Sequence, residues 1–197
     1  TMVARRNREL GDVIRAADLV VPDGAGVVWA LGRQGVRVRR SPGIELAWSL
    51  LNYAAAHGWR VALLGASPDV MERLSARLDQ QLPSLQLVFA EHGYQEEHAW
   101  PELEARLGRH RPDLVLVALG VPRQELWIQR NRAQLPGLWM GVGGSFDVWS
   151  GTKKRAPAWT SRLQMEWLYR LLQDPRRWKR YLVLPQFAWS VLLSLIH

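Results

Sequence analysis

The chain has 197 residues, 48% of them apolar, so it can bury the core of one domain but not of two full ones. It contains no cysteine, which excludes disulfide frameworks, thiolate metal sites and cysteine nucleophiles and favours an intracellular location. The net charge of +8 and the isoelectric point near 10.7 indicate an anionic partner, which can be nucleic acid, a phospholipid surface or a phosphorylated substrate.

The N-terminal segment predicts a helix. Residues 2–17 place apolar and charged side chains at helical spacing, as an amphipathic helix does. Arg5 and Arg6 are followed by charged residues rather than by the apolar core of a signal peptide. The strand that we expect before this helix is missing, so we expect the N-terminus to be incomplete.

A loop with one carboxylate and two glycines follows. The apolar run that begins at Leu19, in LVVPDGAGVVW, predicts a short strand that ends in a loop carrying Asp23, Gly24 and Gly26, with a helix opening near Val27. At the carboxyl end of a strand, such a loop can bring the backbone close to a sugar or a phosphate. Pro-Asp-Gly is also an ordinary turn in which Asp bonds its own backbone, and this alternative stays open.

Four further apolar runs alternate with helices. Strands are expected at 61–65, 85–90, 113–120 and 138–142, and helices at 44–57, at 70–81, up to Arg109 and up to Arg132. Strands that are apolar on both faces and alternate with helices of about ten to fifteen residues predict a parallel sheet covered on both sides. We therefore expect an α/β fold, a Rossmann-like parallel sheet with helices on both faces, over residues 1–152.

The composition changes after residue 152. Residues 153–197 contain nine basic and two acidic residues, an excess of seven positive charges, while the rest of the chain is nearly neutral. They predict basic, tryptophan-rich helices from 156 to 172 and after 175, then an apolar helix over 186–196 that is too short to span a membrane. We interpret 153–197 as a helical appendage for association with an anionic membrane surface. A helical subdomain packed on the core or on a partner subunit is the alternative.

Glycines follow the predicted strands singly or in pairs, without a GxGxxG or Walker pattern. These are Gly65, Gly120, Gly141, Gly143 and Gly144. Strand ends in a parallel sheet line one crevice, which suits a nucleotide-diphosphate ligand, although each glycine alone can serve only a turn. The five histidines lack metal-ligand spacing, so neither a metal site nor a cofactor is expected.

Three polar side chains near these loops are further candidates. Arg40, just before Ser-Pro-Gly, can clamp a phosphate as guanidinium groups do, or be solvated like other arginines in a basic run. Gln124 and Glu125 lie at a strand-to-helix loop, where their alternative role is to cap the helix.

Taken together, the motifs resemble the WecG/TagA/CpsF glycosyltransferases. The resemblance rests on PDGAGVVW, the Arg40-Ser-Pro-Gly element, LLG at 63–65, HGY at 92–94, GVPRQE at 120–125, GVGGSFD at 141–147, and KRAPAW with EWLYRLLQDPRRWKRY. These motifs follow the family's order over almost the whole chain. The departure is at the front, where the family's first strand and its Thr-x-Asn segment are not present.

The resemblance implies an inverting, metal-independent transfer of a sugar from a UDP-sugar to a polyprenyl-diphosphate-linked saccharide. In the best-known members the sugar is N-acetylmannosamine or its uronic acid, and the products are teichoic acid or common antigen; other members act on capsule or exopolysaccharide precursors. The family also implies a peripheral enzyme on the cytoplasmic face of the bacterial plasma membrane that can form homo-oligomers.

Carried over by motif, the resemblance makes Asp23 the general base, with Arg40 near the same pocket and Gln124 orienting the sugar or acceptor. Tyr94, Gly141, Gly143, Gly144 and Asp147 would hold the uridine diphosphate, and Arg170, Arg177 and Arg180 would reach the diphosphates. Gly24, Gly26, Gly65, Gly120 and Glu125 complete the expected substrate-binding set.

Two other classes of function are alternatives to an enzyme. The basic, tryptophan-rich tail is compatible with a nucleic-acid-binding protein, but its charges precede an apolar helix, and the strand-end glycines would then have no purpose. A catalytically inactive relative that binds UDP-sugars or acts as a scaffold is the other alternative. The presence of Asp23, Gln124 and the C-terminal arginines favours an enzyme, without nucleic acid as a partner.

Overall fold

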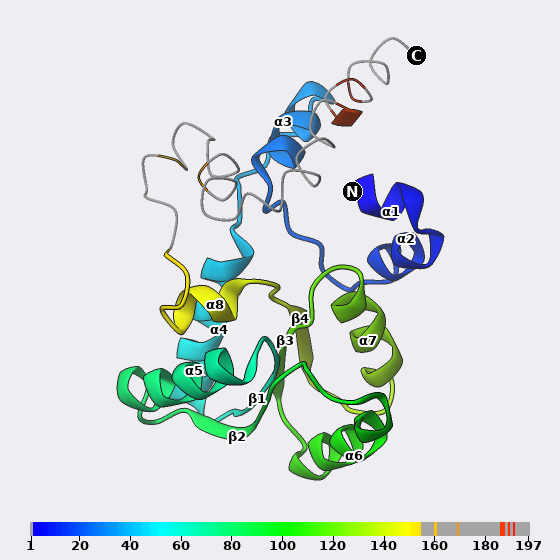
Figure 1. The fold of residues 1–197 in the computed structure, drawn as a ribbon. Coiled ribbons are helices and arrows are strands. Elements are labelled where there is room, and N and C mark those ends of the chain that lie inside the picture. The colour runs from blue at the N-terminus through cyan, green and yellow to red at the C-terminus, as the bar shows by residue number, and fades with distance from the viewer. Residues whose placement is uncertain are drawn as a thin grey trace.

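The computed structural model describes residues 2–154 together with Thr160, Tyr169, Gln186, Phe187, Trp189 and Val191. Within this part, four parallel strands form one sheet in the order β2-β1-β3-β4 (Figure 1). The strands are β1 (Arg60–Gly65), β2 (Gln86–Glu91), β3 (Leu114–Ala118) and β4 (Leu138–Gly141). The four strands predicted between residues 61 and 142 are therefore confirmed. The helices predicted at 156–172 and after 175, and most of 186–196, lie outside the described residues.

The two central strands are buried along their length. All five residues of β3 are buried, and in β1 only Arg60 at the start is exposed. The strands pair in parallel register, with Leu63 opposite Leu116 and Leu64 opposite Val117. Continuous apolar runs are needed here because helices cover both faces of the sheet.

Helices pack on each face because successive side chains of a strand point in opposite directions. On one face, helices α4 (Gly43–His57), α5 (Pro68–Gln81) and α8 (Ser145–Trp149) pack against Leu63 and Leu116. On the other face, α6 (Trp100–His110), preceded by the 3-10 turn η1 (Glu97–Ala99), and α7 (Arg123–Asn131) pack against the neighbouring strand residues. The prediction of an α/β fold with a parallel sheet is confirmed.

Local signals set the ends of two predicted helices. The Ser67 side chain accepts a hydrogen bond from the backbone N–H of Val70, and Pro68 occupies the first turn of α5. Helix α4 ends at Gly58, whose φ of +66° is the left-handed conformation that glycine adopts at low cost. Both helices match their predicted ranges within two residues.

The predicted strand at residues 19–21 is wrong. These residues run as extended chain outside the sheet, and Leu19 and Val20 are 75% and 61% exposed. A strand needs a neighbour to complete its hydrogen bonds, and the described strands offer this segment none. Its β-branched residues alone were a misleading signal.

The predicted helix over 2–17 is divided into α1 (Met2–Arg6) and α2 (Arg8–Arg15). Asn7 has extended backbone angles, and its side chain accepts a hydrogen bond from the backbone N–H of Leu10. Asparagine competes with helix continuation in this way and caps the next helix instead. Beyond the Asp23 loop, α3 (Ala25–Arg33) projects away from the sheet (Figure 1).

Candidate functional site

The carboxyl ends of β1 and β3 approach each other closely at a glycine. Gly65 has φ of +125°, and a Cβ added to it would lie 2.4 Å from the Ala118 carbonyl oxygen. A Cβ on Gly93 would lie 2.7 Å from the Leu119 side chain and 3.1 Å from the Gly65 Cα. Gly93, in the HGY motif, was not predicted as a site residue, although its motif was singled out. The positive φ and the close carbonyl admit only glycine at Gly65, while a side chain at Gly93 would require Leu119 and the Gly65 backbone to shift.

Gln124 connects the loops that follow β3 and β4. Its side chain is 4% exposed, and its Oε1 accepts a hydrogen bond from the Gly143 backbone N–H at 3.2 Å. A Cβ on Gly141 would lie 2.7 Å from Gln124 Nε2, so the strand end leaves room for this amide. No side chain caps α7, hence the alternative role of Gln124 as a helix cap is not the one observed. Three predicted residues, Gln124, Gly141 and Gly143, are thus brought together.

Glu125 accepts the other hydrogen bond of that amide. Gln124 Nε2 donates to Glu125 Oε1 at 2.8 Å, while Glu125 Oε2 is buried without a hydrogen-bond partner among the described residues. Burial raises the pKa of the Glu125 carboxyl above its ordinary value, and the hydrogen bond from Gln124 opposes this shift. The site therefore contains a carboxyl group that resists ionisation and has an unused oxygen.

Asp23 and Arg40 are held together at the base of α3. Arg40 Nε donates to the Asp23 backbone carbonyl at 2.6 Å, and its Nη2 lies 3.8 Å from Asp23 Oδ1. The Asp23 side chain is 57% exposed, whereas that of Arg40 is 25% exposed. Arg40 is therefore positioned rather than freely solvated, and the Asp23 carboxylate stays accessible.

The Asp23 carboxylate also lies near the end of β4. A Cβ placed on Gly43, the first residue of α4, would be 3.5 Å from Asp23 Oδ2 and 3.7 Å from Met140 Cε. Met140 directly precedes Gly141, whose Cα faces the Gln124 amide. Gly43 and Met140 were not among the predicted site residues; only Gly43 had a sequence signal, in the Arg40-Ser-Pro-Gly element. The two halves of the predicted site thus approach each other across β4.

Asp147 forms an ion pair and hydrogen bonds with the segment that follows α8. Its Oδ1 lies 2.8 Å from Lys153 Nζ, and its backbone carbonyl accepts hydrogen bonds from Thr152 Oγ1 and from the Lys153 N–H. A Cβ on Gly144 would lie 3.8 Å from the other Asp147 carboxylate oxygen. The first residue of the predicted appendage, Lys153, is therefore bonded to α8, which directly follows Gly143 and Gly144.

Other predicted residues are not gathered by these contacts. Tyr94 is 76% exposed, and Gly120, with φ of +79°, has open space where a side chain would be. Gly24 precedes α3, and Gly26 contacts Phe187, whose Cε1 lies 3.3 Å from an added Cβ. Arg170, Arg177 and Arg180 lie outside the described residues.

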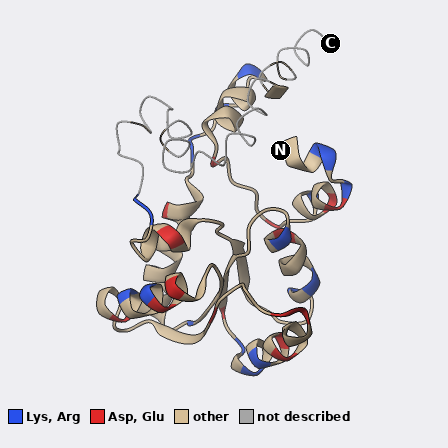
Figure 2. Ribbon diagram, in the orientation of Figure 1, with Lys and Arg blue, Asp and Glu red and all other residues tan. Residues whose placement is uncertain are grey.

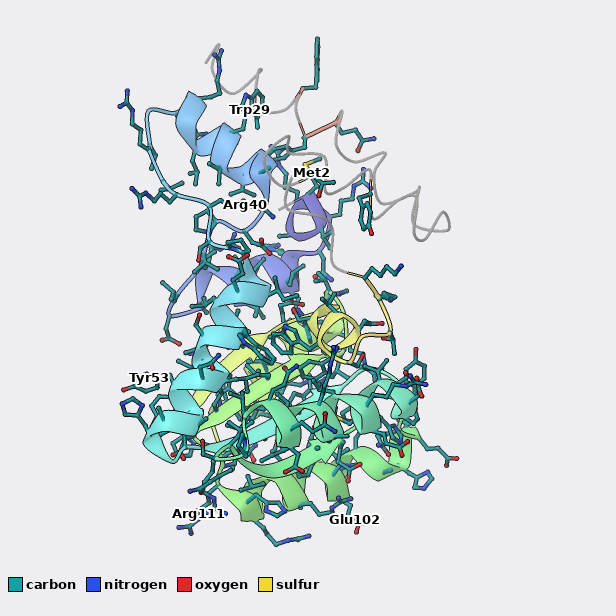
Figure 3. The ribbon with its side chains drawn as sticks, turned by 90° about the vertical axis from the view of Figure 1, so that its left-hand side faces the viewer. Met2, Trp29, Arg40, Tyr53, Glu102 and Arg111 are labelled. Atoms are coloured by element: carbon teal, nitrogen blue, oxygen red, sulfur yellow. The ribbon has the colours of Figure 1, made fainter. Side chains whose placement is uncertain are left out.

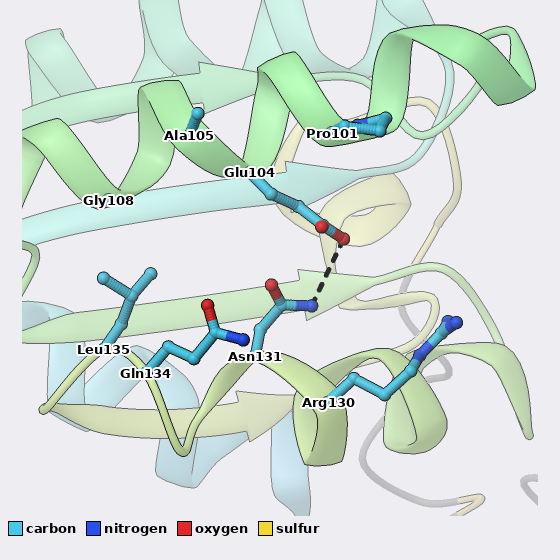
Figure 4. Close-up of a pocket in the computed structure, with 8 residues that line it drawn as sticks. All are labelled: Pro101, Glu104, Ala105, Gly108, Arg130, Asn131, Gln134 and Leu135. Atoms are coloured by element: carbon cyan, nitrogen blue, oxygen red, sulfur yellow. Dashed lines mark hydrogen bonds between the residues drawn. The ribbon is translucent and has the colours of Figure 1, made fainter.

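Two hollows in the surface lie elsewhere. One is between α6 and α7, where Glu104 Oε1 accepts hydrogen bonds from Trp127 Nε1 at 2.7 Å and from Asn131 Nδ2 at 3.3 Å. Figure 4 shows the bond from Asn131. The other is at the amino ends of the strands, beside Trp59 and Gly137. Neither contains a predicted site residue, and the acid in the first is already paired by structural hydrogen bonds. The carboxyl ends of the strands are therefore the better candidate site.

Charged side chains cover the outer helices without forming a metal site in the described part of the chain. Figure 2 shows basic and acidic residues spread over α5, α6 and α7, with a basic end on α3. Within the described residues, no group of three or more His, Asp or Glu side chains could hold a metal ion. Among those residues, too, no helix is both long and apolar enough to cross a bilayer.

Known proteins resemble this chain along its whole length. The model of the glycosyl transferase WecG/TagA/CpsF family matches residues 1–197. A Bacillus subtilis (strain 168) relative is 37% identical over 191 residues, covering 96% of this chain and 74% of the relative. A Staphylococcus aureus (strain MW2) relative is 37% identical over 187 residues, covering 91% and 71%. Both are named N-acetylglucosaminyldiphosphoundecaprenol N-acetyl-beta-D-mannosaminyltransferase. The chain therefore belongs to the WecG/TagA/CpsF family of glycosyl transferases, as its motifs predict.

Proposed function

We propose that this glycosyltransferase moves N-acetylmannosamine, or a related sugar, from a UDP-sugar to a polyprenyl-diphosphate-linked saccharide, in the biosynthesis of a cell-surface polysaccharide. The names of the two relatives support both the sugar and the lipid-linked acceptor. The observation that carries the proposal is the exposed Asp23 carboxylate, which Arg40 holds near Gly43 and the end of β4.

Asp23 acts as the general base of an inverting displacement. Its carboxylate takes the proton of the acceptor hydroxyl while that oxygen forms a bond to the anomeric carbon of the donor sugar. The bond between that carbon and the diphosphate oxygen breaks, and UDP leaves with the electron pair. An accessible carboxylate at the edge of the crevice can meet an acceptor that arrives from outside.

The negative charge on departing UDP is balanced without a metal. Arg40 supplies one positive charge near Asp23, and the backbone around Gly143 and Gly144 can approach a diphosphate closely because these residues lack side chains. Arg170, Arg177 and Arg180 supply further positive charge from the C-terminal part of the chain.

Gln124 and Glu125 orient the sugar. The Gln124 carbonyl binds the Gly143 N–H, and one Nε2 hydrogen binds Glu125, which leaves the second hydrogen of this amide for a ligand. The unpartnered Glu125 Oε2 can bind a sugar hydroxyl in the same region. Residues 153–197 would hold the enzyme at the cytoplasmic face of the plasma membrane, where its lipid-linked acceptor lies.

The decisive experiment measures UDP release from a panel of UDP-sugars with polyprenyl-diphosphate N-acetylglucosamine as acceptor. Release that depends on this acceptor and on one donor is expected. Asp23→Asn should reduce that rate by about a hundredfold or more, because it removes the base while keeping the shape of the side chain.

The matched control is Asp69→Asn, which neutralises an exposed aspartate that pairs with Arg73 on α5, away from the site. Its rate should equal that of the native chain, and both variants should bind UDP in calorimetry. Near-normal turnover of Asp23→Asn would refute the base role, and UDP release that ignores the acceptor would refute the transfer.

A further inference from the structure

Helix α3 is apolar, yet none of its residues is buried. Its sequence is AGVVWALGR, in which Arg33 is the sole charged residue. Trp29 is 39% exposed, Val27 is exposed to a similar degree, and nothing lies within 4 Å of a Cβ added to Gly32. Figure 3 shows α3, which carries Trp29, well away from the sheet and the helices that cover it. Burying apolar helix surface is favourable, so an apolar helix left open in this way marks an interaction site.

The segment after α3 adds positive charge to the same projection. Arg33, Arg37 and Arg39 are exposed, and no ion pair involves them in the part of the chain that the structure describes. The sequence contains no acidic residue between Asp23 and Glu45. Valines and arginines alternate in residues 36–39, which places them on opposite sides of an extended chain.

We infer that residues 25–39, the α3 finger, bind an anionic membrane surface directly. The apolar side chains of α3 enter the interface between headgroups and acyl chains, and the three arginines contact the lipid phosphates. The absence of any acidic residue from the finger favours an anionic lipid surface over a protein partner of mixed charge. This contact is additional to the one proposed for residues 153–197.

The finger is connected to the candidate base at both of its ends. Asp23 lies two residues before Ala25, and Arg40, which binds the Asp23 backbone, directly follows the finger. A nine-residue helix is about 13 Å long at 1.5 Å per residue. Membrane binding by the finger would therefore hold Asp23 within about one helix length of the membrane surface, where a lipid-linked acceptor lies. The inference rests on the proposed function only in naming a lipid-linked acceptor. Binding of the finger to vesicles can be measured without any transfer of sugar.

Near its base, the finger is contacted by a described residue of the C-terminal segment. Phe187 contacts Gly26, one turn before Trp29, which stays partly exposed, and Trp189 is itself exposed. Apolar side chains from the two segments thus lie side by side, which extends the apolar surface offered to a membrane.

The test compares full-length variants in co-sedimentation with phosphatidylglycerol vesicles. Replacing Arg33, Arg37 and Arg39 together by glutamine should weaken binding by about a hundredfold, given the contribution of each arginine near an anionic surface. The matched control replaces Arg109, Arg111 and Arg130, three exposed arginines on α6 and α7 and just after α6, by glutamine and removes the same charge. The control should bind like the native chain; equal binding by both triple variants would overturn the inference.

A probe can then locate the contact, because the native chain has no cysteine. Gln34→Cys at the tip of the finger and Glu102→Cys on α6 each give one site for an environment-sensitive dye. Brominated lipid should quench the dye at position 34 and not the dye at 102. Quenching at neither position would overturn the inference. A dye at position 34 that is already buried without vesicles would also overturn the inference, because the C-terminal segment would then cover the finger. A dye signal that changes with protein concentration would overturn it too, because a second copy of the chain would then cover the finger.

Discussion

The two halves of the candidate site differ in how deeply their surroundings are buried. One half lies at the end of the sheet, and the other lies in the N-terminal third of the molecule. Gln124 follows β3, all of whose residues are buried, and it is hydrogen-bonded to Gly143, which follows the partly buried strand β4. Asp23 and Arg40 lie in a stretch, from residue 12 to residue 46, in which no residue is buried. Segments with few buried contacts open at a lower free energy than core strands do. The proposed donor-binding half is therefore preformed, whereas the half with the base can adjust when an acceptor binds.

The largest expected effect separates the two regions by stability. Gly65→Ala should cost more than about 3 kcal/mol of unfolding free energy, because its φ of +125° and the Ala118 carbonyl at 2.4 Å leave no room for a methyl group. Gly32→Ala, in the open helix α3, should instead stabilise by up to about 1 kcal/mol. Urea unfolding of both variants measures this difference. A similar cost at both positions would show that α3 is packed as tightly as the sheet.

A smaller effect concerns the link between Arg40 and Asp23. Arg40→Lys keeps the charge but removes the Nε–H that donates to the Asp23 carbonyl, so the base loses its positioning. We expect kcat to fall about tenfold, while urea unfolding changes by less than about 1 kcal/mol because the pair is partly solvated. Arg73→Lys, at the exposed pair with Asp69, is the matched control and should leave kcat unchanged. An unchanged kcat in Arg40→Lys would mean that charge alone, without the hydrogen bond, is sufficient.

The same contrast explains which parts of the fold could be predicted from the sequence. The apolar runs of β1 and β3 predict buried parallel strands because apolar residues occupy both sets of alternating positions, so that both faces of each strand are buried. Residues 19–21 have similar composition but no neighbouring strand, and no local pattern reveals whether a neighbour exists. The break in the N-terminal helix at Asn7 depends on one side-chain hydrogen bond, which competes with continuation of the helix that the apolar spacing predicts.

For the candidate site, motif order could predict which residues matter but not how they touch. The bond from Gly143 to Gln124 exists because β4 lies beside β3, a neighbour relation that the chain order does not state. Gly43 lies near both Asp23 and Met140 because α4 begins close to the end of β4. The contact of Gly26 with Phe187 joins residues far apart in the chain, which a turn glycine gives no reason to expect.

The subtlest expected effect lies in the buried half, at Glu125. Burial raises the pKa of this carboxyl, so the folded chain binds the proton more tightly than the unfolded chain does. The stability that this provides is fully present below the ordinary pKa of about 4.5 and is lost as pH rises through the raised value in the folded state. Glu125→Gln cannot ionise and keeps an oxygen for the Gln124 amide. The melting temperature of this variant, relative to that of the native chain, should therefore increase as pH rises from 4 to 7. Glu102→Gln, at an exposed site on α6, should show no such gain. A constant difference between Glu125→Gln and the native chain would mean that water reaches Oε2, and the two halves of the site would then be equally open to solvent.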